Sequence, residues 1–96
     1  MPAYLVARLE VHDIEGFAAY ARAVEPIVKA HGGRYVIRGG PMEIKEGTSQ
    51  PRIVVVEFPT MEAAKAFYEG DDYAPVLQMR LDASKGDLVL VEGVPG

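Results

Sequence analysis

The chain opens with a stretch, residues 3–11, in which apolar and polar side chains alternate. Leu5, Ala7 and Leu9 occupy one phase of this alternation. A period of two residues is typical of a β-strand with one face against a core. Similar apolar segments, bounded by glycine and proline, predict three further strands over residues 34–39, 52–58 and 88–92.

Between these strands, apolar residues recur three or four positions apart, which is the period of an amphipathic helix. One such segment covers residues 14–30 and follows Asp13, a residue type that caps helix N-termini. A second covers residues 61–69 and follows Thr60 in the same way. A further short helix is predicted within residues 72–83, and Pro26 predicts a kink or break in the first helix.

The element order is therefore β-α-β-β-α-β, which is the split βαβ pattern of ferredoxin-like domains. Right-handed crossovers place four antiparallel strands in one sheet, with the first and second strands parallel and the third between them. The helices then cover one face of the sheet. A chain of 96 residues is long enough for one α+β domain, residues 1–96, but not for two.

Strand alternation predicts which side chains lie under the helices and which lie on the opposite, open face of the sheet. The apolar residues assigned to the open face are Val6, Val36, Ile53, Val55, Leu88 and Leu90. Monomers rarely expose an apolar patch of this kind. Burying one such side chain stabilises by about 1.5–3 kcal/mol, so we expect an isologous homodimer, sheet against sheet, in a dimeric α/β barrel.

The composition argues against several kinds of partner and bond. The net charge is −4 and basic residues are scattered, so no nucleic-acid surface is predicted. The absence of cysteine excludes disulfides and thiolate metal sites, and it fits a reducing cytoplasm. No signal-peptide pattern is seen, and no apolar run approaches the roughly 20 residues needed to cross a bilayer. We expect a soluble cytoplasmic domain without a membrane partner.

Among the charged residues that this alternation places on the open face, four are the candidate ligand-binding residues. They are Arg8, Arg38, Glu57 and Glu92. Charges on a buried face should be paired or should bind something. One interpretation is ion pairs at the dimer interface, with Arg8 paired to Glu10. The other is a cationic pocket end for a small organic anion, with Arg38 as the main anion ligand.

Three residues are candidates for proton transfer: Tyr4, His31 and Glu57. Tyr4 shares a predicted face with Glu57. His31 ends the first predicted helix, where an imidazolium is favoured by the helix dipole, and its pKa range also suits a proton carrier. The alternative for the tyrosine and the histidine is a purely structural role.

The sequence contains no motif for a nucleotide, hydrolase or metal site. The pair Gly39-Gly40 lacks the spacing of a dinucleotide-binding loop. Ser49 and Ser84 lack the context of a hydrolase nucleophile. Two distant histidines without cysteine give no transition-metal site. We therefore expect no metal and no cofactor.

Several short motifs together resemble one family. They are Met1-Pro2-Ala3-Tyr4, His31-Gly32-Gly33-Arg34, Arg38-Gly39-Gly40, Val56-Glu57-Phe58-Pro59, and the segment from Asp87 to Gly93. In these motifs the chain resembles the domain of unknown function 1330 family, of the dimeric α/β-barrel superfamily. The resemblance implies the barrel dimer but no activity. Superfamily relatives include cofactor-free monooxygenases, muconolactone isomerase-like enzymes and stress-response barrels, and this kinship is an analogy of fold.

Two hypotheses for function remain open. The first is binding, or cofactor-independent transformation, of a small organic anion in a cavity of the dimeric barrel. The second is a non-catalytic stress-response or scaffold homodimer.

Overall fold

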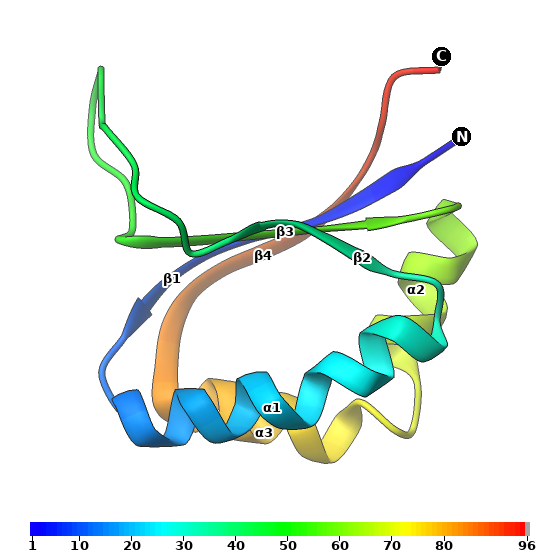
Figure 1. Ribbon diagram of the computed structural model, residues 1–96, viewed down its shortest axis with the longest axis horizontal. Coiled ribbons are helices and arrows are strands. Elements are labelled where there is room, and N and C mark those ends of the chain that lie inside the picture. Colours follow the sequence, from blue (N-terminus) through cyan, green and yellow to red (C-terminus); the bar gives the residue numbers. More distant parts are fainter. Residues whose placement is uncertain (96) are drawn as a thin grey trace.

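The computed structural model describes residues 1–95 and has the expected α+β architecture. The elements are β1 (Ala3–Val11), α1 (Ile14–Ala30), β2 (Arg34–Arg38), β3 (Arg52–Phe58), α2 (Met61–Glu69), α3 (Ala74–Ala83) and β4 (Ser84–Glu92). The sheet order is β2-β3-β1-β4, and each neighbouring pair is antiparallel. The three helices lie together on one side of the curved sheet (Figure 1). The ferredoxin-like prediction is confirmed.

Both predicted helix caps are present. The Asp13 carboxylate accepts a hydrogen bond of 3.0 Å from the Gly16 amide, and the Thr60 hydroxyl accepts one of 3.1 Å from the Ala63 amide. Each cap satisfies a backbone donor that the first helical turn leaves free. The helix α1 is not broken at Pro26. Within residues 1–95, no helix is both long and apolar enough to span a membrane.

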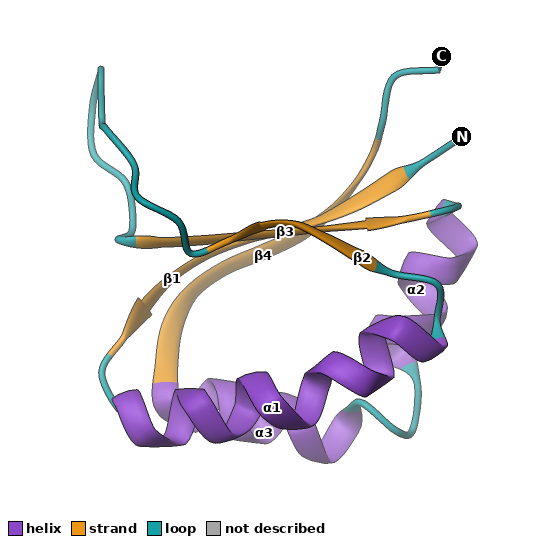
Figure 2. Ribbon diagram, viewed as in Figure 1, coloured by secondary structure: helices purple, strands orange, loops and turns teal. Residues whose placement is uncertain are grey.

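Figure 2 shows the helices as one layer beside the sheet, and the core consists of buried side chains from both. Its largest fully buried side chains are Leu9 and Phe58 from the sheet, Phe67 from α2, and Tyr73 at the start of α3. The ring of Phe67 lies 4.6 Å from that of Tyr73 and 5.4 Å from that of Phe58, centre to centre. This aromatic cluster fixes the helix layer at one end of the sheet.

The pairing of β1 with β4 corrects one face assignment. Leu5 lies opposite Leu90 and Ala7 lies opposite Leu88, so both leucines of β4 point towards the helices. Val89 and Val91 take their places on the open face, where they are 53% and 47% exposed. The end of β4 is apolar in both phases, so alternation alone could not select the correct one.

A bulge in β2 corrects a second assignment. Tyr35 lies opposite Val56, but the next pair is Ile37 with Val55, followed by Arg38 with Val54. Val36 is thus the extra residue of the bulge, which reverses the side to which the following residues point. Arg38 therefore lies on the helix face of the sheet with Val54.

An irregular arm, residues 40–50, joins β2 to β3 and rises from the sheet on the side away from the helices (Figure 1). The backbone amide of Gly39 donates to the Ile53 carbonyl at 2.8 Å, and this is the last hydrogen bond between the two strands before the arm begins.

Candidate functional site

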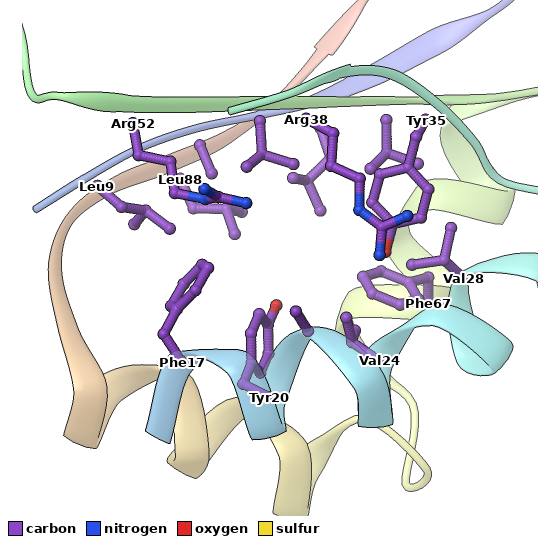
Figure 3. A pocket seen from close by; sticks show the side chains of 15 residues that line it. Leu9, Phe17, Tyr20, Val24, Val28, Tyr35, Arg38, Arg52, Phe67 and Leu88 are labelled. Carbon is purple, nitrogen blue, oxygen red and sulfur yellow. The ribbon is translucent and has the colours of Figure 1, made fainter. Parts of the chain in front are cut away.

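A cavity of about 50 Å³ lies between α1 and the helix face of the sheet. Its walls are largely apolar, and they include Leu5, Leu9, Phe17, Val24, Val28 and Leu88. Two guanidinium groups reach it from the sheet, and two tyrosine rings stand in its walls (Figure 3). An apolar enclosure with a few convergent polar groups is the usual composition of a small-molecule site.

Arg52 is the first residue of β3, and it lies opposite Leu9, so its side chain points under the helices. Its guanidinium carbon lies 5.0 Å from the centre of the Phe17 ring. The Nε atom is buried and has no hydrogen-bond partner in the described part of the chain. No carboxylate among residues 1–95 forms an ion pair with Arg52. A buried cationic donor without a partner is costly, so this atom favours binding of an anion.

Gly39 makes room for the Arg52 guanidinium. Its φ is +68°, and a Cβ atom built there would lie 2.5 Å from Nη1 and 2.6 Å from Cζ of Arg52. Real Cβ atoms do not approach other atoms so closely. Glycine is therefore favoured here by its backbone conformation, and a larger residue would displace the Arg52 guanidinium.

Arg38 enters the cavity from β2 and is more exposed than Arg52. Its guanidinium carbon lies 4.2 Å from the centre of the Tyr35 ring, and its Nη1 donates to Glu25 Oε2 of α1 at 3.4 Å. The hydrogen bond from Arg38 holds the pKa of the Glu25 carboxyl below its usual range. Arg38 thus has an acidic partner, whereas Arg52 has none among residues 1–95.

A buried chain of hydroxyl groups forms part of the helix side of the site. The Tyr20 hydroxyl oxygen lies 3.0 Å from that of Tyr73, and Arg80 Nε donates to the Tyr73 oxygen at 3.4 Å. Burial, and then the charge of a neighbouring Tyr73, raise the pKa of Tyr20 far above that of free tyrosine. Burial also raises the pKa of Tyr35. Both residues therefore keep their protons at neutral pH and can donate hydrogen bonds.

The candidates predicted from the sequence did not include Arg52, Tyr20, Tyr73 or Arg80. Arg52 is in phase with Val54 and Val56 in its strand, so the alternation of β3 already placed it under the helices. Tyr20 lies three positions after Phe17, on the apolar side of α1. The link from Tyr20 to Tyr73 and Arg80 joins residues 53 and more positions apart, and no local pattern reveals it.

The predicted ligand-binding residues do not form one cluster. Arg8 is on the open face and pairs with Asp87 of β4 at 3.4 Å, whereas Glu10 pairs with Lys85 at 3.2 Å. The expected pair of Arg8 with Glu10 is therefore wrong, because β4 supplies closer partners to both. The predicted proximity of Arg8 and Arg38 on one face is wrong as well, because of the bulge in β2.

The predicted acids are also separated. Glu57 lies on the open face, where it accepts a hydrogen bond from the Tyr4 hydroxyl at 3.3 Å and pairs with Arg34. Glu92 is exposed at the end of β4, opposite Ala3 and so in the phase of the helix face. The predicted grouping of Glu57 with Glu92 on the open face is therefore wrong. The pairing of β4 with β1 puts Glu92 in the same phase as Leu88 and Leu90.

His31 caps the C-terminus of α1. Its Nε2 lies 3.2 Å from Asp72 Oδ2, and its ring meets the edge of the Phe67 ring at 5.9 Å, outside the cavity lining. Within residues 1–95, no three side chains of histidine, aspartate or glutamate gather into a cluster that could hold a metal ion.

Solved structures share this fold. The RPA0582 protein of unknown function from Rhodopseudomonas palustris is 16% identical, with a TM-score of 0.74, over 99% of this chain and 84% of that chain. SnoaB, described as a cofactor-independent oxygenase from Streptomyces nogalater, is 15% identical, with a TM-score of 0.70, over 99% of this chain and 95% of that chain. Identities this low show similarity of fold alone. A search of curated proteins found no match.

The family expected from the sequence motifs is confirmed. The family described as Domain of unknown function (DUF1330) matches residues 2–94, which is nearly the whole chain. The matched segment contains the whole cavity lining, including Arg52, and also Gly39. The chain therefore belongs to the DUF1330 family.

Proposed function

We propose that this protein binds a small organic anion in the cavity between α1 and the sheet, with Arg52 as its principal ligand. The observation that carries the proposal is the buried Arg52 Nε, which has no partner in the described chain and is surrounded by apolar walls. An anion would satisfy this donor, and an arginine fork binds a planar carboxylate through two hydrogen bonds.

Size and charge narrow the choice of ligand. One water molecule needs roughly 10–15 Å³ of such space, so a cavity of about 50 Å³ suits a short aliphatic or single-ring acid. Arg38, which lies on the neighbouring strand and is more exposed, adds a second guanidinium group to the cavity lining. The apolar walls receive the hydrocarbon part of the ligand. Arg38 thus keeps its predicted ligand-binding role in this proposal, although it reaches the ligand from the helix face.

The proposal extends to transformation of the bound anion without a cofactor. It is supported by buried hydroxyl donors in the wall of the cavity, which can stabilise charge that forms on a bound molecule. SnoaB, which shares the fold, is described as a cofactor-independent oxygenase.

The first test compares melting temperatures of the wild type and Arg52→Met with a panel of short carboxylates. A ligand at about 100 times its Kd stabilises by about 2.7 kcal/mol, and each kcal/mol raises the melting temperature by roughly 4–8 °C in a domain of this size. At that ligand concentration we expect shifts of roughly 10–20 °C for the wild type, none for Arg52→Met, and reduced shifts for Arg38→Met, since Arg38 also binds Glu25.

Arg22→Met is the matched control for this test. Arg22 is an exposed residue of α1 that does not line the cavity, so its replacement should leave the ligand-induced shifts unchanged. If no carboxylate stabilises the wild type, or if Arg52→Met responds as the wild type does, the anion site is refuted. The scaffold hypothesis would then be the better one.

A second prediction concerns the space that Gly39 leaves for Arg52. Gly39→Ala should displace the guanidinium and abolish the carboxylate-induced shift, in addition to a backbone cost of about 1 kcal/mol or more. Gly47→Ala is the control, because Gly47 has a similar φ of +72° and no atom lies within 4 Å of the position that its Cβ would take. Calorimetric titration with a binding acid should show the wild-type Kd for Gly47→Ala. An unchanged Kd for Gly39→Ala would contradict the proposed role of Gly39.

We also infer that the open face of the sheet is the homodimer interface. After the corrections to β2 and β4, its apolar residues are Val6, Ile37, Ile53, Val55, Val89 and Val91. Three of them, at positions 37, 89 and 91, are 44–53% exposed in the single chain. The face is as apolar as the sequence predicted, although its membership differs. A second copy of the chain supplies the same apolar surface to cover it.

A further inference from the structure

The hydrogen bonds behind the cavity fix the direction in which one hydroxyl proton points. Arg80 Nε can only donate, so the Tyr73 oxygen accepts from it. Tyr73 is fully buried, and the Tyr20 oxygen is the one acceptor that its own proton reaches in the described chain. Tyr73 therefore donates to Tyr20. In the reverse order the Tyr73 proton would be unpaired at a cost of about 1–3 kcal/mol, because Tyr73 does not line the cavity. The Tyr20 proton faces the cavity, where water or a ligand can accept it.

This order leaves the Tyr20 proton free to be donated elsewhere. Tyr20 lines the cavity, and Figure 3 shows its ring rising from α1 with the hydroxyl directed towards the sheet, while Arg52 descends from the sheet. The cavity thus offers a neutral donor on its helix side and a cationic donor on its sheet side. A ligand with two separate oxygen groups can satisfy both.

Arg80 strengthens the donor on the helix side. It is 6% exposed and forms no ion pair with any carboxylate among residues 1–95. Its positive charge lies behind Tyr73, so it polarises the chain of hydroxyls towards the cavity. A carbonyl oxygen that accepts from Tyr20 would gain from this polarisation, because it carries partial negative charge.

We propose that the ligand of the cavity is a small oxo acid, whose carboxylate binds Arg52 and whose carbonyl oxygen accepts a hydrogen bond from Tyr20. This inference rests on the proposed anion site and adds the class of ligand. It assigns Tyr20 as a specificity-determining residue, with Tyr73 and Arg80 as positioning residues that set the direction of its proton.

The test compares calorimetric affinities for pentanoate with those for 2-oxopentanoate, 4-oxopentanoate and 5-oxopentanoate. These acids have the same chain length, and they vary the distance between carboxylate and carbonyl. We expect at least one oxo acid to bind the wild type roughly ten-fold more tightly than pentanoate, as one added hydrogen bond allows. In Tyr20→Phe this preference should vanish while the pentanoate Kd stays the same. Tyr73→Phe should retain part of the preference.

The outcomes separate the two proposals. Arg52-dependent binding of pentanoate without preference for any oxo acid, or a preference that survives in Tyr20→Phe, overturns the oxo-acid inference and leaves the anion site intact. Failure of all four acids to bind the wild type refutes both. If Tyr20→Phe does not fold by circular dichroism, the variant that combines Tyr20→Phe with Tyr73→Phe and Arg80→Met carries the same test, because neither tyrosine proton nor the Arg80 donor is then left unpaired.

Discussion

Val55→Asp will split the inferred homodimer into monomers or unfold the chain. Val55 lies at the centre of the open face, between Val6 of β1 and Ile37 of β2. In a sheet-to-sheet dimer this position would be covered by the partner in both subunits. An unpaired charge buried there costs several kcal/mol per site, and the two-fold axis places two such charges in one interface.

Light scattering coupled to gel filtration at micromolar concentration measures the result. The wild type should have twice the chain mass of 10.4 kDa, and Val55→Asp should have the single mass if it remains folded. Ile14→Asp is the control, because Ile14 is 80% exposed on α1, far from the open face, and should stay dimeric. A wild-type monomer, or a stable Val55→Asp dimer, would show that the open face is not the interface.

The elements of this fold could be predicted because each depends on local physical chemistry. The alternation over β1 follows from one face against a core, and the ends of the helices follow from Asp13 and Thr60, whose side chains satisfy free backbone amides. The order of elements then limits the topology to a few arrangements, of which the ferredoxin-like one is usual. None of these steps needs knowledge of distant contacts.

The faces of β2 and β4 depend on contacts that local patterns do not contain. Leu88, Val89, Leu90 and Val91 are apolar in both phases, so only pairing with β1 selects the phase. The bulge at Val36 is a property of the β2–β3 pair and moves Arg38 to the helix face. The predicted anion ligand Arg38 therefore lies beside the cavity, whereas Arg8 lies on the opposite face.

The candidate site could be predicted only in its general character. A cationic group beside an apolar cavity was expected, but the candidate arginines, Arg8 and Arg38, were both assigned to the open face. Arg52 was not among the candidates because an arginine at the start of a strand is usually solvated, and only the close approach of Gly39 and Phe17 shows that its guanidinium is held inside. Which of Tyr20 and Tyr73 donates in their hydrogen bond depends on the packing of α3 against α1, two elements distant in the sequence.

The sharpest constraint on the backbone near the cavity is at Gly86. α3 ends at Ala83 and β4 begins at Ser84, so no loop separates the helix from the strand. The Ala83 carbonyl accepts hydrogen bonds from the amides of His12 and Asp13, at 3.0 and 3.1 Å, which fixes the start of β4 beside β1. Gly86 lies opposite Leu9, two residues after the start of β4, and this strand curves from the helix layer into the sheet (Figure 1).

Gly86→Ala will therefore destabilise the fold strongly. The φ of Gly86 is +149°, and a Cβ atom would lie 2.0 Å from the backbone oxygen of Arg8, an atom that cannot move aside as a side chain can. Strain and the loss of pairing with β1 should lower the free energy of unfolding by roughly 3 kcal/mol, which is the upper end of the cost for one strained residue. The melting temperature should then fall by more than about 10 °C. Gly40→Ala, with no atom within 4 Å of its Cβ, should melt near the wild type. Equal melting temperatures for the two variants would contradict the close approach of β4 to β1 at this point.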